Sequence, residues 1–351
     1  MDRGNNSEEQ IMLSSVIPSV NAKWEVKEVP TPQAGTNQVL IKIHASGICY
    51  TDVHITKGGL GVKFPHTVGH EPAGEIVAIG EGVTTRKVGD RVGVPWLQST
   101  FGRCEWCQRG KLFFCPNQIA TGINIAGSHA EYMVAYADAT QLIPTGLSYD
   151  QAAPIFCAGY TVYSGLRFAD PKPHERVAVV GIGALGHLGI QYSKAAGFET
   201  IAVTHSKDKE ELAYKLGADS VVSDGEGLLK EHNVSSDGGS GGGADVILAT
   251  SNSYKATADS IKGLRPDGRF VLMGVSTTEP FTISPEILFK RARIIGSTQN
   301  DREHLYEALD YVAKGKVRVM TETFPLEEIS NAYDKVANGN VRFKAVIEPT
   351  T

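Results

Sequence analysis

The first 150 residues contain short apolar runs rich in β-branched residues, and turns that often contain glycine separate these runs. Examples are VLIKIHASG at Val39 to Gly47, GEIVAIG at Gly74 to Gly80 and DRVGVPW at Asp90 to Trp96. Several short strands with turn residues at close intervals are typical of all-β structure. This part of the chain therefore predicts a small, irregular barrel or sandwich.

The pattern changes near Glu175. ERVAVVG is a β-branched run that ends in glycine, and GIGALGHLGIQYSKAAG then reads as a turn that leads into a helix. Further strands are expected at Glu199 to Thr204, Asp219 to Ser223, Ala244 to Thr250, Gly268 to Val275 and Ala292 to Ser297, with a helix at KDKEELAYKLGA. Strands that alternate with helices predict a parallel, doubly wound sheet.

Two other segments complete the pattern. The glycine- and serine-rich stretch Ser235 to Gly243 is expected to be a flexible surface loop. After it, the last predicted helix runs from Asp301 to Gly315, and the chain ends in a predicted strand, RFKAVIEP. We expect this tail to return to the first domain.

Length and composition fit a soluble protein of two domains. The chain has 351 residues, of which 41% are hydrophobic and 21% are charged. A chain of this length usually folds into more than one domain, each with its own hydrophobic core. The net charge of -5 offers no basic excess for nucleic acid. No apolar run is long enough to span a membrane, and the polar N-terminus lacks the apolar core of a signal peptide. We therefore expect a cytoplasmic protein without nucleic-acid or membrane partners.

Gly181, Gly183 and Gly186 form the pattern G-x-G-x-x-G between a predicted strand and a predicted helix. In that context the first glycine allows a tight turn, the second lets the backbone approach a pyrophosphate, and the third lets the helix pack closely on the strand. The helix N-terminus then faces the anion. The sequence therefore predicts a dinucleotide-binding domain.

The end of the second strand indicates which dinucleotide is preferred. An acidic residue there would accept hydrogen bonds from a ribose 2′-hydroxyl and favour NAD. This chain instead has Thr204, His205, Ser206 and Lys207, which add donors and positive charge suited to a 2′-phosphate. We predict a preference for NADP(H), with Asp208 expected to lie past the ribose.

Five cysteines are present, and clustered thiols in a reducing compartment more often bind metal than form disulfides. Cys49 lies in GICYTDVH, His70 and Glu71 lie in GHEPAGEIVAIG, and Cys157 lies in PIFCAGYTVYSG. A separate segment, FGRCEWCQRGKLFFC, has the spacing C-x2-C-x7-C. Together with the nucleotide-binding pattern, these motifs resemble the zinc-dependent alcohol dehydrogenases of the medium-chain dehydrogenase/reductase family over nearly the whole chain.

The resemblance implies an α/β fold with a Rossmann doubly wound parallel sheet and a GroES-like β-rich catalytic domain. The expected limits are 1–160 for the catalytic domain, completed by 298–351, and 161–297 for the Rossmann domain. The reaction would be hydride transfer between a nicotinamide cofactor and a primary or secondary alcohol, or the corresponding aldehyde or ketone. Zinc would act as a Lewis acid on the substrate oxygen.

The resemblance also implies residue roles around the catalytic zinc. Cys49, His70 and Cys157 would bind the ion, and Glu71 beside it is a candidate ligand when the substrate position is empty. Asp52 would contact the zinc-bound His70, not the ion, and hold its ring in place. Thr51 would hydrogen-bond the substrate oxygen, and His54 would accept the proton through the cofactor ribose.

Other positions are carried over from the family pattern. Thr161 would pack against the nicotinamide, Arg302 and Lys344 would lie near the cofactor phosphates, and Trp96 would form a wall of the substrate pocket. Tyr50 stands where relatives often place a basic residue against the pyrophosphate. Its phenol is uncharged, so one phosphate contact is expected to be weaker.

The three-cysteine segment departs from the family pattern. Relatives often carry a structural zinc on C-x2-C-x2-C-x7-C, and alignment on Cys104, Cys107 and Cys115 places the first cysteine at 101, where this chain has Phe101. The usual following glycine is present as Gly102. A structural zinc needs four ligands, so a weakened zinc site and an empty lobe with three free thiols both remain open.

Two other functions remain alternatives on the same fold. One is a zinc-free quinone or enone reductase, and the other is a non-catalytic nucleotide-binding relative. The sequence does not identify the alcohol or carbonyl substrate. A homodimer or homotetramer is expected, formed through the nucleotide-domain sheet near Phe281 to Ser297.

Overall fold

The structure is a computed structural model of the chain, and it describes residues 10–231, 241–276 and 279–349. Residues 235–240 of the predicted glycine- and serine-rich loop lie outside the described residues. The chain divides into two compact units, Met1–Cys157 with Thr321–Thr351 and Ala158–Met320. None of the helices within the described ranges is long and apolar enough to cross a membrane.

The first unit is built around a mostly antiparallel sheet. Its main elements are β1 (Ile11–Val16), β2 (Glu25–Pro30), β3 (Gln38–Gly47), α1 (Tyr50–Thr56), β4 (Pro72–Ile79), β5 (Arg91–Gly93), β6 (Leu97–Ser99), α2 (Glu105–Gln108), β7 (Ile119–Ala120), β8 (Tyr132–Tyr136), β9 (Gln141–Leu142), α3 (Tyr149–Ala152), β16 (Thr321–Pro325), α11 (Ile329–Ala337) and β17 (Lys344–Glu348). The sheet order is β16-β17-β3-β4-β5-β9, and β8 also pairs with β3.

Strand β3 shows why this sheet forms. Val39, Ile41 and Ile43 are fully buried on one face, and they pack in a cluster with Ile76 of β4 and Met133 of β8. The intervening residues are partly exposed, so the strand has the period of two expected for a half-buried strand. The predicted β-rich first domain is therefore observed.

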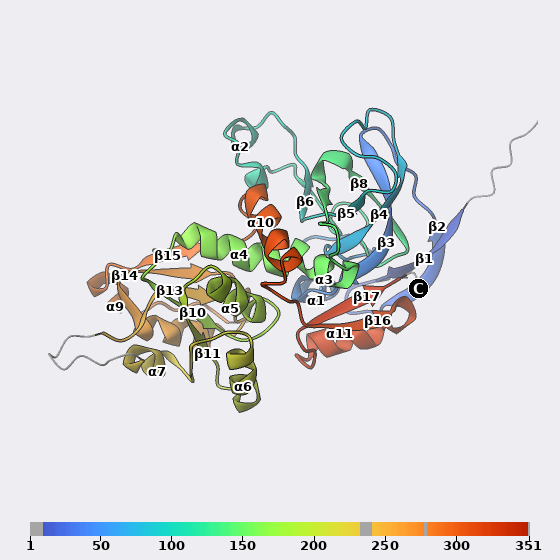
Figure 1. Cartoon of the computed structure of the whole chain (residues 1–351). Helices are drawn as coiled ribbons and strands as arrows, with labels where there is room; N and C mark the ends of the chain where they lie inside the picture. The colour runs from blue at the N-terminus through green and yellow to red at the C-terminus, as the bar shows by residue number, and fades with distance from the viewer. Residues whose placement is uncertain (1–9, 232–240, 277–278, 350–351) are drawn as a thin grey trace, which may run out of the picture. The chain divides into compact units, whose positions relative to one another are not determined.

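The end of the chain completes this sheet. Strand β17 pairs antiparallel with β3, with Val346 opposite Gly47, and β16 pairs in parallel with β17. Figure 1 shows these C-terminal strands beside β3. Because β3 ends at Gly47, the last strand lies directly against the segment that leads to Cys49.

The second unit contains an all-parallel sheet with helices around it. Its elements are α4 (Ala158–Ala169), β10 (Arg176–Val180), α5 (Gly186–Ala195), β11 (Glu199–Val203), α6 (Lys207–Lys215), β12 (Ser220–Val222), α7 (Gly225–Lys230), β13 (Ala244–Ala249), α8 (Tyr254–Asp259), β14 (Leu264–Leu272), α9 (Glu286–Phe289), β15 (Arg293–Gly296) and α10 (Arg302–Ala313). The order β12-β11-β10-β13-β14-β15 is that of a Rossmann sheet (Figure 1).

Both faces of this sheet are covered. In β10, Ala178 and Val180 pack in a cluster with Leu228 of α7. An added Cβ at Gly189 of α5 would lie 3.4 Å from Val179 Cγ1, so this helix packs on the other face. Burial on two faces explains the nearly continuous apolar runs that the sequence showed.

The second unit extends further along the chain than the Rossmann limits expected from the sequence. Helix α10 packs against α4, so the segment from 298 to 320 lies within this unit. His304 of α10 is buried, and its Nδ1 lies 3.2 Å from Ser164 Oγ of α4. After Cys157, the chain returns to the first unit only from Thr321 onward.

Candidate metal centre and nucleotide-binding loop

Four predicted metal-centre residues meet at one point in the first unit. Cys49 caps the N-terminus of α1, His70 and Glu71 directly precede β4, and Cys157 follows a short 3-10 helix. The antiparallel pairing of β3 with β4 brings the first two segments together, because Gly47 N–H donates to the Glu71 carbonyl. The ligand atoms of these four residues all lie within 4.8 Å of one another.

The donor set fits a catalytic zinc site. Cys49 Sγ and Cys157 Sγ are 3.9 Å apart. Two sulfurs each about 2.3 Å from a tetrahedral zinc would lie about 3.8 Å apart. His70 is 1% exposed, and within the described part of the chain its Nε2 has no hydrogen-bond partner. A buried imidazole nitrogen without a partner is costly unless it binds something, so these residues fit the ion.

The surroundings of Cys49 and Cys157 shift the pKa values of their thiols. A hydrogen bond with Cys157 holds the pKa of Cys49 well below the ordinary thiol value, and the charges of His70 and Lys344 act in the same direction. The same hydrogen bond and burial raise the pKa of Cys157. The lowered pKa favours the thiolate form of Cys49, and a bound zinc would require both sulfurs to be deprotonated.

Glu71 forms a buried ion pair beside the donor cluster. Its Oε1 lies 2.6 Å from Lys344 Nζ, and the ammonium also donates to the Ile48 carbonyl at 3.0 Å. Burial raises the pKa of Glu71 to about 7, against the lowering effect of Lys344. A Cβ at Gly47 would lie 2.0 Å from Glu71 Oε2, so only glycine fits there.

Lys344 was expected near the cofactor phosphates. The structure places its side chain inside the first unit, only 1% exposed, with its ammonium directed at Glu71. Burial would lower the pKa of Lys344, but electrostatic interaction with Glu71, Cys49 and Cys157 raises it. This ammonium therefore provides the counter-charge of the metal centre.

Asp52 lies behind His70, as the family resemblance implied. Its Oδ1 is 3.6 Å from His70 Nδ1, and its Oδ2 accepts a 2.8 Å hydrogen bond from Cys49 N–H. Burial alone would raise the pKa of this carboxyl, but interactions with His129 and His70 lower it overall. The aspartate therefore stays ionised and ties the capping turn of α1 to His70.

The remaining catalytic candidates of the first unit surround the same site. Thr51 Oγ1 lies 3.5 Å from Cys49 Sγ, and His54 follows it one helical turn later on α1, half-buried and edge-on to Tyr50. The Trp96 ring is edge-on to His70, with centroids 5.4 Å apart. Trp96 therefore lies beside His70, and its role as a wall of the substrate pocket stays a prediction.

The three-cysteine lobe is a separate group. Cys104, Cys107 and Cys115 have ligand atoms within 4.8 Å of one another, and no fourth metal-capable side chain joins them among the described residues. Phe101 is 52% exposed and offers no metal ligand, and its backbone N–H lies 3.4 Å from Cys115 Sγ. The lobe therefore does not provide the four ligands of a closed structural zinc site.

The glycine loop of the second unit has the geometry that the motif requires. Gly181 has φ +86°, and a Cβ at Gly186 would lie 1.8 Å from the Gly181 carbonyl oxygen. A Cβ at Gly183 would meet no protein atom within 4 Å, so packing within the protein does not explain this glycine. That open position fits the close approach of a pyrophosphate.

The loop adjoins the end of β11. Gly181 N–H donates to the Val203 carbonyl at 3.0 Å, which places the segment after β11 next to the glycine turn. Thr204 and Ser206 are partly buried, with Ser206 N–H 3.2 Å from Thr204 Oγ1, whereas His205 and Lys207 are exposed.

The two other cofactor candidates of this unit lie on helices. Thr161 lies in α4, and Arg302 is the exposed first residue of α10.

Comparisons with known proteins agree with this arrangement. Residues 35–145 match the family described as alcohol dehydrogenase GroES-like domain, and residues 184–314 match the zinc-binding dehydrogenase family. An alcohol dehydrogenase of Geobacillus stearothermophilus is 40% identical over 344 residues, which cover 96% of this chain and 99% of that protein. The chain belongs to the alcohol dehydrogenases of the medium-chain dehydrogenase/reductase family.

Solved structures of similar dehydrogenases have the same fold. A putative zinc-binding dehydrogenase from Sinorhizobium meliloti, bound to NADP, has a TM-score of 0.86 and 29% identity, with 97% of this chain and 100% of that chain covered. The alcohol dehydrogenase of Aeropyrum pernix has a TM-score of 0.86 and 28% identity, with coverage of 96% and 100%. The predicted GroES-like and Rossmann architecture of this alcohol dehydrogenase is thus confirmed.

One buried residue of the dehydrogenase was not singled out from the sequence. His129, in the stretch IAGSHAEY, has its Nε2 3.6 Å from Asp52 Oδ2. Its position depends on backbone pairing between residues 127–129 and residues 67–69, and no spacing in the sequence shows such a pairing.

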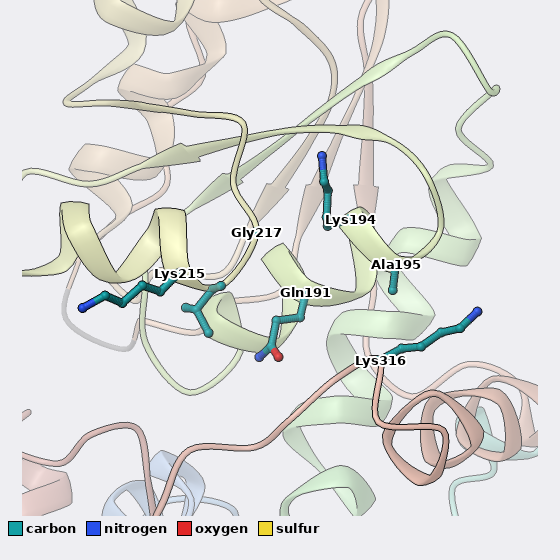
Figure 2. Close-up of a pocket in the computed structure, with 7 residues that line it drawn as sticks. Gln191, Lys194, Ala195, Lys215, Gly217 and Lys316 are labelled. Carbon is teal, nitrogen blue, oxygen red and sulfur yellow. The ribbon is translucent and has the colours of Figure 1, made fainter.

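A surface pocket in the second unit of the dehydrogenase carries no candidate chemistry. It has a volume of about 450 Å³ beside α5 and α6, and Lys194, Lys215 and Lys316 contribute to its lining. Figure 2 shows these lysines extending in different directions. The Gln191 amide is already bonded to the carbonyls of His187 and Arg318 and to Arg318 N–H. The pocket therefore presents no convergent set of ligand-binding groups.

Proposed function

We propose that this enzyme is a zinc-dependent dehydrogenase that transfers hydride between NADP(H) and an alcohol or the corresponding aldehyde or ketone. Cys49, His70 and Cys157 would hold the ion, with Glu71 as a candidate fourth ligand. The observation that carries the proposal is the convergence of these donor atoms within 4.8 Å of one another, while His70 Nε2 has no hydrogen-bond partner among the described residues. When bound, zinc supplies Lewis-acid polarisation of the substrate oxygen, and the nicotinamide supplies or accepts the hydride.

The protein residues would orient the substrate and move its proton. Thr51, beside Cys49, would hydrogen-bond the substrate hydroxyl, and His54 one turn away would pass the proton toward solvent. Trp96, edge-on to His70, would limit the width of the pocket and exclude water. The Glu71–Lys344 pair would balance charge when the substrate changes its protonation state.

The proposed preference for NADP(H) rests on the segment after β11. Thr204 and Ser206 offer hydroxyl groups, and His205 and Lys207 are exposed and can meet a 2′-phosphate. The Sinorhizobium relative was solved with NADP. Asp224 interacts electrostatically with His205, so this segment has one negative charge beside its positive ones.

A substrate panel tests this function. Primary and secondary alcohols, aldehydes and ketones are assayed with both cofactors on protein of measured zinc content. We expect turnover that requires zinc and is fastest with NADP(H). Turnover of quinones or enones by zinc-free protein would support the alternative reductase, and no turnover by zinc-loaded protein would support a non-catalytic relative.

We further propose that the enzyme assembles through the edge of its parallel sheet. Strand β15 is the last strand in that sheet, and the adjacent helix α9 exposes 72% of Leu288 and 88% of Phe289. Large exposed apolar side chains beside an unpaired strand edge favour association with a second copy. Light scattering should show a dimer or tetramer, and the double change Leu288→Glu and Phe289→Glu should release monomers.

A further inference from the structure

The Asp52 carboxylate lies between two buried histidines. Its Oδ1 faces His70 Nδ1 at 3.6 Å, and its Oδ2 faces His129 Nε2 at the same distance. Asp52 and His129 are fully buried. Among the described residues, Asp52 Oδ1, His70 Nδ1 and His129 Nε2 have no hydrogen-bond partner, so each has only the facing group to satisfy it.

The backbone holds His129 at a fixed position relative to His70. Gly127 N–H donates to the Thr67 carbonyl, Ser128 N–H to Gly69 and His129 N–H to Val68, so this segment runs along the residues that lead into His70. A Cβ at Gly69 would lie 2.9 Å from His129 Cγ, and Gly69 has φ +110°. The ring therefore occupies space that only a glycine at 69 leaves free.

Two serines orient the ring from its other side. His129 Nδ1 lies 2.8 Å from Ser46 Oγ, and Ser46 Oγ lies 2.6 Å from Ser128 Oγ, with both serines fully buried. If Ser128 donates to Ser46, the Ser46 hydroxyl is free to donate to His129 Nδ1. The proton of the ring then sits on Nε2, where it points at Asp52.

We propose that His129 is a positioning residue of the metal centre, which orients Asp52 so that Asp52 in turn orients His70 toward the ion. The inference rests on the proposed metal site. It extends that site by a series of successive contacts, which runs Ser128–Ser46–His129–Asp52–His70. A carboxylate that must satisfy a metal-bound histidine needs its second oxygen held in place. Cys49 N–H holds that oxygen from one side and His129 from another.

Two substitutions separate hydrogen bonding from packing. His129→Phe keeps an aromatic ring beside Trp24, whose ring centroid lies 5.5 Å from that of His129, but removes the ring nitrogen that faces Asp52 Oδ2. His129→Gln replaces the ring by an amide that can donate to the same oxygen. His44→Phe is the matched control, because His44 is a histidine of the same unit that stacks on Tyr149.

The experiment measures zinc affinity by competition with a chelator and the visible spectrum of the cobalt-loaded protein, alongside the melting temperature of each metal-free variant. We expect His129→Phe to lower zinc affinity about 10- to 100-fold and to shift the cobalt bands, because the His70 ligand is less well oriented. His129→Gln should recover most of the affinity and the spectrum, and His44→Phe should match the wild type.

Three results would overturn the proposal. Equal affinity and equal spectra for His129→Phe and the wild type would contradict a positioning role. Equal losses in His129→Phe and His129→Gln that follow their melting temperatures would show that His129 serves packing alone. Wild-type protein that binds no ion at Cys49, His70 and Cys157 would contradict the proposed metal site itself, and this inference with it.

Discussion

Lys344 Nζ lies 2.6 Å from Glu71 Oε1, and both side chains are almost completely buried. The pair joins the last strand, β17, to the residue that follows His70. Lys344 therefore places a positively charged ammonium beside the candidate metal centre. The ammonium is fixed further by the carbonyl of Ile48, the residue that follows β3. The C-terminal segment is therefore part of the site as well as part of the sheet.

Removal of the Lys344 charge should destabilise the protein strongly. Lys344→Met leaves the buried Glu71 carboxylate without its partner, and the free energy of unfolding should fall by about 3–5 kcal/mol. Denaturant unfolding of the metal-free protein measures this. The double variant Glu71→Gln with Lys344→Met removes both charges and should regain part of the loss. If the single variant were as stable as the wild type, the pair would have no structural importance.

The lobe of Cys104, Cys107 and Cys115 should gain zinc when a fourth thiol is supplied. Phe101→Cys restores four ligands, so zinc per chain and the melting temperature should rise. The chemical step should be nearly unchanged, because the metal centre is a separate group of residues. Metal analysis, thermal unfolding and kcat measure these effects, with Phe101→Ser as the control. A large loss of activity in Phe101→Cys would show that the lobe influences catalysis.

The elements of the parallel sheet could be predicted from the sequence because its central strands, β10, β11 and β13, are short apolar runs that are almost completely buried. Gly181, Gly183 and Gly186 could be assigned because their spacing follows from local backbone requirements. The metal donors could be named only through family resemblance, since the segments that carry Cys49, His70 and Cys157 meet through sheet pairing.

Other contacts could not be predicted because they depend on register and on long-range packing. The contact between His129 and Asp52 requires residues 127–129 to pair with residues 67–69. The position of Lys344 requires β17 to pair with β3 at Gly47. The expected position of Lys344 near the cofactor phosphates came from the family pattern, and nothing in the sequence indicated that this side chain would be buried.

An acidic residue after β11 should change the cofactor preference. Thr204→Asp places a carboxylate where it accepts hydrogen bonds from a ribose 2′-hydroxyl and repels a 2′-phosphate. The ratio of kcat/KM for NADH to that for NADPH should rise by about tenfold or more, as expected for a charge-assisted hydrogen bond. Thr204→Ser, which keeps the hydroxyl, is the control. A wild type that already prefers NADH would contradict the proposed NADP(H) preference.

His54 should matter most for turnover at low pH. Burial is the largest cause of its lowered pKa, and the Lys57 charge adds to it although Cys49 acts against it, so the ring keeps its proton-accepting form to a lower pH than a free histidine does. His54→Gln should slow alcohol oxidation about tenfold or more at low pH, where hydroxide is scarce, and added buffer should restore part of the rate. Steady-state rates between pH 5.5 and 9 measure this, with His44→Gln as the control. No effect at any pH would exclude a relay through His54.

The central claim is that the ion held by Cys49, His70 and Cys157 is required for hydride transfer. The most direct test is to remove zinc with a chelator, return it in known amounts, and record alcohol-dependent reduction of NADP⁺ at each step. The account predicts no turnover in the metal-free protein and a rate that rises to a plateau as the site fills, with no recovery in Cys49→Ser. Full turnover by protein shown to contain no metal would contradict it.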